Sequence, residues 1–478
     1  MIINRERRKP VWFALVCVLA ALSMISMTAC SNAGSQADYD KAYTIGLQAY
    51  VYGLPLLETN RTFLTMTSIN VSNNNGFGPV NQFNHARKLN DPNSTAVVAP
   101  GANGLSSIAW VDLSQEPQVL HVPQVTGHHF VLALLDPYTE DLRNLGSAQN
   151  TTPGDYVIRG PGQEKSALPA GTQAIDVAYT RIWIIGSTQL LGASDVANVN
   201  QIQDGYTLTP LSQFGSGWKP QPPATPDTTV DQAALPSGVE FFDTLGQLLK
   251  QFPPPAADKA ALDSFATVGI GPGKTPSKDG RLSAAALRGL AQAVTDGPAQ
   301  IQKDAKALFL AGAQKHNGYF LGGFGVYGTD YALRAVIAEV GLGAMSSEQA
   351  VFAIAMADHS GQPLTGSSKY ILHLPEMPPA GEGWSLTVYN LKGALMANPI
   401  NRYQFNGSSE FTKNADGSVD IYLQALQPSD AAQAANWLPV TDGQGFEVMW
   451  RLLAPESDQI SGILDGSGWQ PPAITLAQ

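Results

Sequence analysis

The stretch Gly383–Tyr403, GWSLTVYNLKGALMANPINRY, decides how the C-terminal part of the chain is folded. Every second residue at its start is large and apolar: Trp384, Leu386 and Val388. A period of two places such side chains on one buried face of a β-strand. Turn residues follow at 390–393, and Asn398-Pro399 ends the next apolar run. We therefore expect a hairpin that leads into an irregular loop carrying Arg402.

Strand patterns recur on both sides of this hairpin. They occupy residues 351–357, 370–374, 419–423 and 446–453. Ser346 and Gln349 also fit a helix capping box, which makes a helix the alternative for 348–357. Bulky and small residues alternate over 351–357, and we interpret it as a strand. The pattern predicts a C-terminal β domain over 342–478.

Helices are predicted between this β domain and a proline-rich linker at 220–239. Large apolar residues spaced by four, three and four positions line one helical face: Phe241, Leu245, Leu248 and Phe252. Alanine-rich segments with good helical propensity follow at 258–267, 282–295 and 298–313, and a short helix at 330–340 ends at Gly341. Residues 240–341 are thus expected to be helical.

The N-terminal domain is predicted over 38–219. A helix begins at Asp38, and Gly53 and Pro55 are expected to break or bend it. Strands at 119–122 and 130–135 flank a turn, and shorter strands follow at 156–158, 173–178 and 182–185. The predicted fold class is α+β multidomain, with an N-terminal α/β module containing an antiparallel sheet.

The first residues have the layout of a secretory signal. Basic residues precede an apolar run at Val11–Met27, which Thr28-Ala29-Cys30 follows. A cysteine at this position resembles the lipobox of bacterial lipoproteins. We expect removal of residues 1–29, lipidation of Cys30, and a polar tether at 30–37, with the protein exported and held at the cell envelope, by analogy at the outer membrane. A transmembrane anchor is the alternative.

Cysteine and charge exclude several classes of protein. The other cysteine, Cys17, lies in the predicted signal, so the mature chain would carry no free thiol for disulfides or thiolate chemistry. The signal carries a net charge of +3, from four basic residues and Glu6, so its removal changes the formal net charge from −11 to −14. Such a charge disfavours nucleic-acid binding, and the expected membrane contact is the lipid at Cys30.

Several motifs resemble known families. The N-terminal ones resemble domain of unknown function 1254: Ala49–Leu56, Trp110–Leu113, Leu134–Tyr138 and Asn144–Gly146. The C-terminal ones resemble domain of unknown function 1214: Tyr327–Tyr331 with Arg334-Ala335, Trp384–Tyr389, Asn398–Tyr403, Asp416–Ser418, Asn436–Pro439 and Gly468–Pro472. The pairing implies an exported protein with an α/β N-terminal part and a jelly-roll-like C-terminal β-sandwich. It implies no reaction.

The chain departs from the first family's usual pattern in two places. Pro100–Ser106, PGANGLS, replaces a segment that usually carries an Asn, a carboxylate, a Thr and a Tyr. Gly127–Phe130, GHHF, replaces Gly-Arg-Tyr-Tyr. If those polar groups line the family's site, the site is altered here.

Motifs for common catalytic classes are absent from the sequence. No Gly-x-Ser-x-Gly elbow is present, although a triad assembled from distant residues is an alternative. His128 and His129 are neighbours on an expected strand and point to opposite faces, so they do not chelate one metal together. No metal site or cofactor is predicted.

Two groups of residues are candidates for a site. Asp136, Glu140 and Asp141 surround Tyr138, and could serve acid/base work or bind Ca²⁺, or carry ordinary surface charge. The second group could form an aromatic and guanidinium pocket: Trp384, Tyr389, Asn398 and Arg402. The alternative is that such a Trp belongs to the core and such an Arg pairs with a carboxylate at the domain interface.

We expect a membrane-tethered protein that binds a small molecule or glycan between its two modules. The predicted ligand-binding residues are Tyr138, Trp384, Tyr389, Asn398 and Arg402. The alternative is a hydrolase or lyase in which Asp136 or Asp141 is the base and Arg402 the electrostatic stabiliser. The ligand and the oligomeric state are not predicted.

One tetrapeptide occurs twice. Gly-Ser-Gly-Trp stands at 215–218 and at 466–469, each time before a proline-rich segment. Both copies could peg a terminal strand with a buried Trp. Two unrelated proline-rich domain ends are the alternative.

Overall fold

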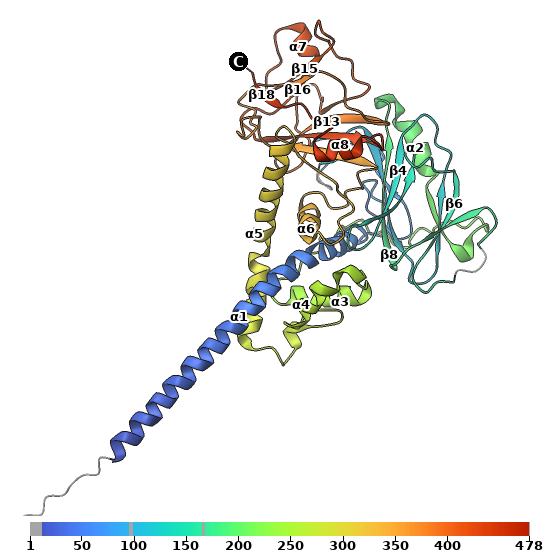
Figure 1. The fold of residues 1–478 in the computed structure, drawn as a ribbon. Helices are drawn as coiled ribbons and strands as arrows, with labels where there is room; N and C mark the ends of the chain where they lie inside the picture. Colours follow the sequence, from blue (N-terminus) through green and yellow to red (C-terminus); the bar gives the residue numbers. More distant parts are fainter. Residues whose placement is uncertain (1–11, 95–98, 165–167, 478) are drawn as a thin grey trace, which may run out of the picture. The chain divides into compact units, whose positions relative to one another are not determined.

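The computed structural model describes residues 12–94, 99–164 and 168–477, with side chains from residue 34 onward. The chain divides into two compact units (Figure 1). One comprises the residues up to Tyr50 together with Pro236–Gln300, and the other comprises Val51–Leu235 together with Ile301–Gln478. This grouping follows spatial contacts, whereas the boundaries at 219, 239 and 341 remain a prediction from sequence.

The first unit is helical. It contains the first part of α1 (Trp12–Met66), α3 (Glu240–Gln251), α4 (Lys259–Ala266) and the first part of α5 (Ala284–Lys315). Glycines let α1 and α5 approach closely, because a Cβ on Gly289 would lie 2.4 Å from the Tyr39 carbonyl oxygen. The Tyr50 ring stacks on Phe241 of α3 at 4.7 Å, and Tyr43 donates to Asp296 at 3.1 Å.

Two expectations about helix ends were wrong. Helix α1 begins at Trp12 rather than Asp38, includes the polar segment 31–37, and is continuous through Gly53 and Pro55, which excludes a break but leaves a bend as a prediction. Proline removes one helical hydrogen bond and its ring crowds the preceding turn, but the apolar side chains around Pro55, among them Leu54 and Leu56, stay buried. The segments 282–295 and 298–313 likewise form the single helix α5, with Pro298 inside it.

The predicted signal at 1–29 is described only in part, as the backbone of helix α1 from Trp12 onward. Residues 1–11 are not among the described residues, and the Cys30 side chain is not described either. Among the helices that could be searched, none is both long enough and apolar enough to span a membrane.

The second unit begins with a β-sandwich. Its five-stranded sheet has the order β1 (Asn84–His85), β2 (Gly104–Asp112), β8 (Arg181–Gln189), β4 (Phe130–Leu135) and β5 (Asp141–Gly146). Its four-stranded sheet has the order β7 (Thr172–Asp176), β6 (Gly154–Arg159), β3 (Gln118–Val122) and β9 (Thr207–Pro210). A buried apolar core that includes Leu120, Leu132 and Ile184 joins the sheets, and α2 (Val196–Asp204) follows β8. Within this sandwich, β6–β7 is a parallel ladder and the other ladders are antiparallel.

A second β-sandwich forms the C-terminal part of the same unit (Figure 1). One sheet has the order β10 (Phe320–Gly322), β11 (Ala350–Ala355), β17 (Phe446–Leu453), β13 (Gly383–Asn390) and β14 (Gln404–Asn406). The other has the order β16 (Trp437–Pro439), β15 (Val419–Gln424), β12 (Tyr370–Leu374) and β18 (Ile474–Leu476). Helix α6 (Tyr331–Val340) precedes β11, and the short helices α7 (Ala431–Ala435) and α8 (Ile460–Asp465) follow β15 and β17. The predicted α+β class with a C-terminal β-sandwich is confirmed.

Strand β13 is buried on both faces, although its sequence alternates. Leu386 and Val388 point into the sandwich core, as predicted. Ser385 and Thr387 on the other face are also fully buried. This second face is the side of Tyr389, which packs with Leu395, Met449 and, from the N-terminal sandwich region, Ala99 and Ala102. The alternation therefore reflects two buried environments of different polarity.

Candidate functional site

Arg334 of α6 is the most completely buried guanidinium among the described residues, with a side chain that is 1% exposed. Helix α6 begins directly after the glycine-rich loop 322–329, and Asp330 caps it by accepting from the Leu333 N–H at 3.0 Å. This cap fixes the first helical turn, on which Arg334 lies. A buried cation is costly unless nearby groups compensate its charge and hydrogen-bond its N–H groups. The groups around Arg334 therefore indicate whether it is structural or binds a ligand.

Three tyrosine rings surround this guanidinium. Its central carbon lies 5.3 Å from the ring centroid of Tyr331 and 5.5 Å from those of Tyr52 and Tyr138. The rings come from α6, from α1 and from the turn after β4, so segments distant in sequence meet here. Each distance is within the range of a cation–π interaction.

Glu140 supplies the nearest carboxylate. Its Oε1 lies 3.7 Å from Nη1 of Arg334, an ion pair too long for a hydrogen bond. The same carboxylate accepts from the backbone N–H groups of Tyr327 at 2.9 Å and Gly328 at 3.0 Å. Glu140 therefore holds the glycine-rich loop as well as facing Arg334, and its side chain is 19% exposed.

Two donors of Arg334 have no hydrogen-bond partner in the described structure. They are the buried Nε and Nη2 groups. These two N–H bonds lie parallel on one edge of the planar guanidinium, the edge that a carboxylate or phosphate binds with two oxygens. A buried N–H group without a hydrogen-bond partner destabilises the fold. The Nε–Nη2 edge is therefore the strongest sign that the cluster binds a hydrogen-bond acceptor from outside the chain.

Asp136 lies in the turn that carries Tyr138. Its Oδ1 accepts from the backbone N–H groups of Tyr138 at 2.7 Å and Glu140 at 3.0 Å, and the residue is 4% exposed. Burial raises the pKa of the Asp136 carboxyl to about 7, against the opposing effect of those N–H groups and of Arg334. Near neutral pH, this carboxyl can therefore either accept or donate a proton.

The predicted acidic residues are thus partly gathered here. Asp136 and Tyr138 belong to the Arg334 cluster, whereas Asp141 ties β5 to a neighbouring loop. Its Oδ2 accepts from the Ser346 N–H and from Asn144 Nδ2, both at 2.9 Å. Its role as a base remains a prediction.

Tyr389 lies in a second buried cluster. Its hydroxyl donates to the Pro100 carbonyl at 2.9 Å, and its ring lies 5.4 Å from the Arg451 guanidinium. Arg451 donates to the carbonyl of Ala99 and, at 3.4 Å, to Thr387 Oγ1. The start of the altered segment Pro100–Ser106 thus contributes a backbone carbonyl to this cluster.

The structure does not bring the other predicted ligand residues to Arg334. Trp384 packs in the C-terminal core, 5.4 Å from the Trp450 ring. Asn398 donates to the carbonyls of Met396 and Arg402, which shapes the loop after β13. Arg402 Nη1 donates to the carbonyls of Ala435 and Trp437 at 3.1 and 2.8 Å. Among the described residues no carboxylate contacts Arg402, which differs from the alternative interpretation that this Arg pairs with a carboxylate.

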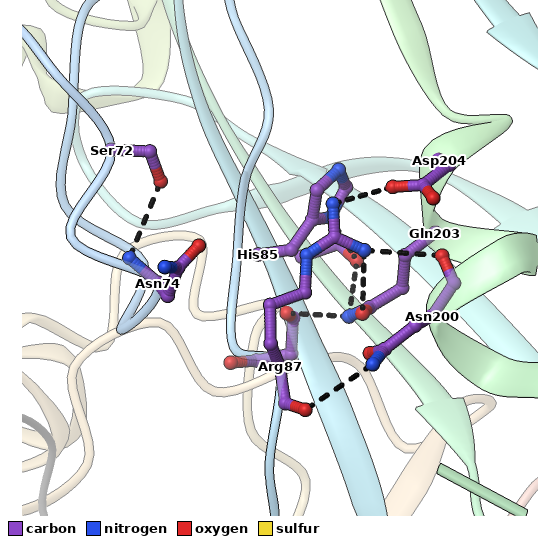
Figure 2. A network of polar contacts seen from close by, with 9 residues as sticks. Ser72, Asn74, His85, Arg87, Asn200, Gln203 and Asp204 are labelled. Carbon is purple, nitrogen blue, oxygen red and sulfur yellow. Dashed lines mark hydrogen bonds and ion pairs between the residues drawn. The ribbon is translucent and has the colours of Figure 1, made fainter. Parts of the chain in front are cut away.

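A buried serine–histidine pair lies on the N-terminal sheet. His85 Nδ1 lies 2.9 Å from Ser107 Oγ, and Gln203 Nε2 donates to the same oxygen at 3.2 Å. Figure 2 shows His85 and Gln203 beside Arg87, which pairs with Asp204 at 2.6 Å. Ser107 is fully buried, and Gln203 donates to the serine rather than orienting the histidine, so the arrangement is not that of a triad. This network joins β1, β2 and α2 and has no open path for a substrate at Ser107.

The His85 network predicts a pH dependence of stability. Burial, with a smaller contribution from Arg87, lowers the pKa of His85 to about 4. Because the folded pKa lies below that of the unfolded chain, the neutral ring stabilises the fold above pH ~6.5, and this contribution is lost as the pH falls through about 4. We expect His85→Gln to reduce the loss of unfolding free energy between those limits by about 2–3 kcal/mol, measured by urea denaturation at several pH values.

The exposed His359 provides the control. The His359→Gln variant should follow the wild-type pH curve. Equal curves for His85→Gln and the wild type would contradict the assigned role of His85.

The fold and cluster define an α+β protein with two β-sandwiches and a buried arginine–tyrosine cluster in one compact unit. Residues 80–210 match the family model "Protein of unknown function (DUF1254)", and residues 349–457 match "Protein of unknown function (DUF1214)". The chain thus carries both domains in this order, which confirms the resemblance.

One solved structure shows the same fold. The VPA0106 protein from Vibrio parahaemolyticus superposes with a TM-score of 0.63 at 21% sequence identity, covering 91% of this chain and 100% of that chain. An uncharacterised protein from Burkholderia cenocepacia has a TM-score of 0.41 at 12% identity, covering 94% of this chain and 97% of that chain. A search of curated proteins found no match.

Arg334 was missed as a site residue, although a signal existed. It stands beside Tyr327–Tyr331 in the segment that resembles the second family, while Tyr52 and Tyr138 stand in segments that resemble the first. Nothing in their spacing says that these segments meet. Within the described chain, no three His, Cys, Asp or Glu side chains are placed to hold a metal ion.

Proposed function

We propose that the protein binds a small carboxylate-bearing molecule at Arg334. The observation that supports this proposal is the unpartnered Nε–Nη2 edge of a guanidinium that is 1% exposed. A carboxylate across this edge would make two charge-assisted hydrogen bonds in the geometry that arginine favours. It would replace the missing partners of both donors at once.

The surroundings favour a small ligand with an apolar body. Tyr52, Tyr138 and Tyr331 offer aromatic surface around the guanidinium. Asp136, half protonated near pH 7, can donate a hydrogen bond to a ligand oxygen. Ligand sites commonly combine such aromatic walls with few polar groups.

Entry of the ligand requires a local opening, because Arg334 is closed off. The glycine-rich loop 322–329 is the part of the cluster suited to open. Glu140 holds it through two backbone N–H groups, and Val326 on it is 65% exposed. Phe324 and Tyr327 of the same loop are buried, so opening has to release both side chains.

Calorimetric titration tests this proposal, with acetate, succinate, citrate and benzoate as probes at low salt. At least one probe should bind the wild type saturably, and Arg334→Met should abolish its binding. Arg87→Met is the matched control, because Arg87 in the same unit already has a carboxylate partner at 2.6 Å. Binding that survives Arg334→Met, or no binding by any probe, would refute the site.

Export and lipid anchoring are part of the same proposal. They are supported by the basic and apolar N-terminal segment and by Cys30 after Thr28-Ala29. Mass spectrometry of the protein from native membranes should find an acylated N-terminal Cys30. A Cys30→Ser variant should lose both the acyl mass and the membrane association.

A hydrolase or lyase is the second candidate, favoured by the pKa of about 7 at Asp136. In such an enzyme, Asp136 would be the base, and Arg334 would stabilise negative charge in place of the predicted Arg402. Bases with a pKa near the working pH are efficient in proton transfer. Turnover of an ester or hydroxy acid that is lost in Asp136→Asn would favour this candidate over simple binding.

The raised pKa of the Asp136 carboxyl predicts that the free energy of unfolding falls as the pH rises. Its folded pKa of about 7 lies above the ordinary 3.8, so the protonated carboxyl stabilises the fold at low pH, and this contribution is lost as the pH rises through about 7. Relative to Asp136→Asn, the wild type should lose as much as about 4 kcal/mol between those limits, measured by urea denaturation. A constant difference between the two proteins across this range would show that burial does not perturb Asp136.

A further inference from the structure

A pocket of about 210 Å³ opens on the four-stranded sheet of the N-terminal sandwich. None of the residues that line it belongs to the Arg334 cluster. Strands β3, β6 and β9 provide its floor, and the loop after β9 provides its wall. The side chains that matter for its chemistry are His121, Asp155, Thr207, Thr209, Phe214 and Trp218. Its volume is below the ~300–1,000 Å³ of pockets for drug-sized ligands, so it suits a ligand of one ring.

The floor of the pocket is polar and partly open to solvent. His121 and Asp155 are directly opposite on β3 and β6, with Nδ1 and Oδ1 2.7 Å apart, and their side chains are 44% and 29% exposed. Thr207 and Thr209 add hydroxyl groups from β9. Imidazole, carboxylate and hydroxyl groups together offer both donors and acceptors.

The wall of the pocket is aromatic, and hydrogen bonds and two glycines fix the turn that carries it. Glu116 accepts from the N–H and hydroxyl groups of Ser212 at 2.8 and 3.0 Å, which anchors the start of the loop. Gly215 and Gly217 adopt φ values of +78° and +74°, a region that other residues rarely enter. This turn leaves Phe214 and Trp218 half-buried along the pocket.

The two Gly-Ser-Gly-Trp copies therefore differ in role. Trp469 is half-buried and packs edge-on against Trp450 at 6.0 Å, beside the C-terminal core. Trp218 instead lines the surface pocket. An aromatic side chain that a glycine turn holds at a polar pocket is well placed to pack against a ligand.

We propose that this pocket binds a neutral pyranose sugar, either free or as the end of a glycan. The C–H face of a sugar ring would pack on Trp218 and Phe214, while its hydroxyls would bond to His121, Asp155 and the two threonines. The carboxylate in the floor and the formal net charge of −11 disfavour anionic ligands. The site is separate from Arg334 and does not depend on the function proposed there.

Saturation-transfer NMR and tryptophan fluorescence of the full chain test the proposal. The probes are glucose, galactose, mannose and N-acetylglucosamine, each also as a short oligosaccharide, at up to high millimolar concentrations. At least one probe should bind saturably to the wild type, and Trp218→Ala should weaken that binding at least tenfold. A stronger response to the oligosaccharide would identify a glycan end as the source, and an equal response would identify the free sugar.

A matched pair of variants separates binding from folding. His121→Ala should weaken sugar binding, whereas His373→Ala should not, because His373 forms the same cross-strand pair with Asp420, at 2.7 Å, on the other sandwich. Absence of saturable binding by every probe, sugar binding unchanged in Trp218→Ala, or binding of Zn²⁺ without any sugar would each overturn the proposal. Carboxylate titration of the same variants reports on Arg334 independently, so the two sites can fail separately.

Discussion

Replacing Glu140 with alanine is expected to lower the free energy of unfolding by about 3–5 kcal/mol, the cost of leaving a buried charge without its partner. Arg334 is 1% exposed, and Glu140 supplies the carboxylate 3.7 Å from it. The same substitution removes the acceptor of the Tyr327 and Gly328 N–H groups, which releases the glycine-rich loop. Urea denaturation at neutral pH measures the effect.

An exposed ion pair provides the control for this prediction. Asp204 pairs with Arg87 at 2.6 Å, but its side chain is 64% exposed. Asp204→Ala should therefore cost no more than about 1 kcal/mol. A similar loss for both variants would show that Glu140 has no special role in compensating a buried charge.

Arg334→Met is expected to give the opposite combination: a fold of nearly unchanged stability that no longer binds carboxylates. Two donors of Arg334 lack partners, so its removal relieves a desolvation cost, and methionine fills most of the volume between the tyrosines. Glu140 keeps two backbone hydrogen bonds and partial exposure to solvent. The free energy of unfolding should change by no more than about 2 kcal/mol, while carboxylate binding in the calorimeter is lost.

The double variant decides between a binding and a purely structural Arg334. In Glu140→Ala with Arg334→Met, no buried charge is left alone, so the double variant should be more stable than Glu140→Ala by itself. If Arg334 served only to hold the fold, Arg334→Met would be as destabilising as Glu140→Ala. Both substitutions would then lower the free energy of unfolding for the same reason, the loss of the Arg334–Glu140 ion pair.

The period-two patterns predicted the sandwiches because burial of alternate residues is a local property of a strand. Residues 385–389 became part of β13, and 351–357 contains most of β11. The burial of Ser385 and Thr387 could not be predicted, since it depends on chain near Ala99 that is almost three hundred positions away. The helices were harder to delimit, because Pro55 and Pro298 each remove a single bond that packing can outweigh.

The site was predictable only in part, for the same reason. Asp136 and Tyr138 stood out because acidic and aromatic residues gather within a few positions. Arg334 has Tyr327, Asp330 and Tyr331 as sequence neighbours. Its relation to Tyr52 and Tyr138 arises only when α1, α6 and the turn after β4 meet. Arg402 looked similar in sequence, but its Nη1 donates to the backbone carbonyls of Ala435 and Trp437.

A crystal structure of the full chain soaked with the tightest carboxylate probe tests the central claim most directly. The claim predicts planar density across Nε and Nη2 of Arg334, with both oxygens at hydrogen-bond distance, and no such density in Arg334→Met. Ordered water or protein atoms filling that edge at saturating probe would contradict it.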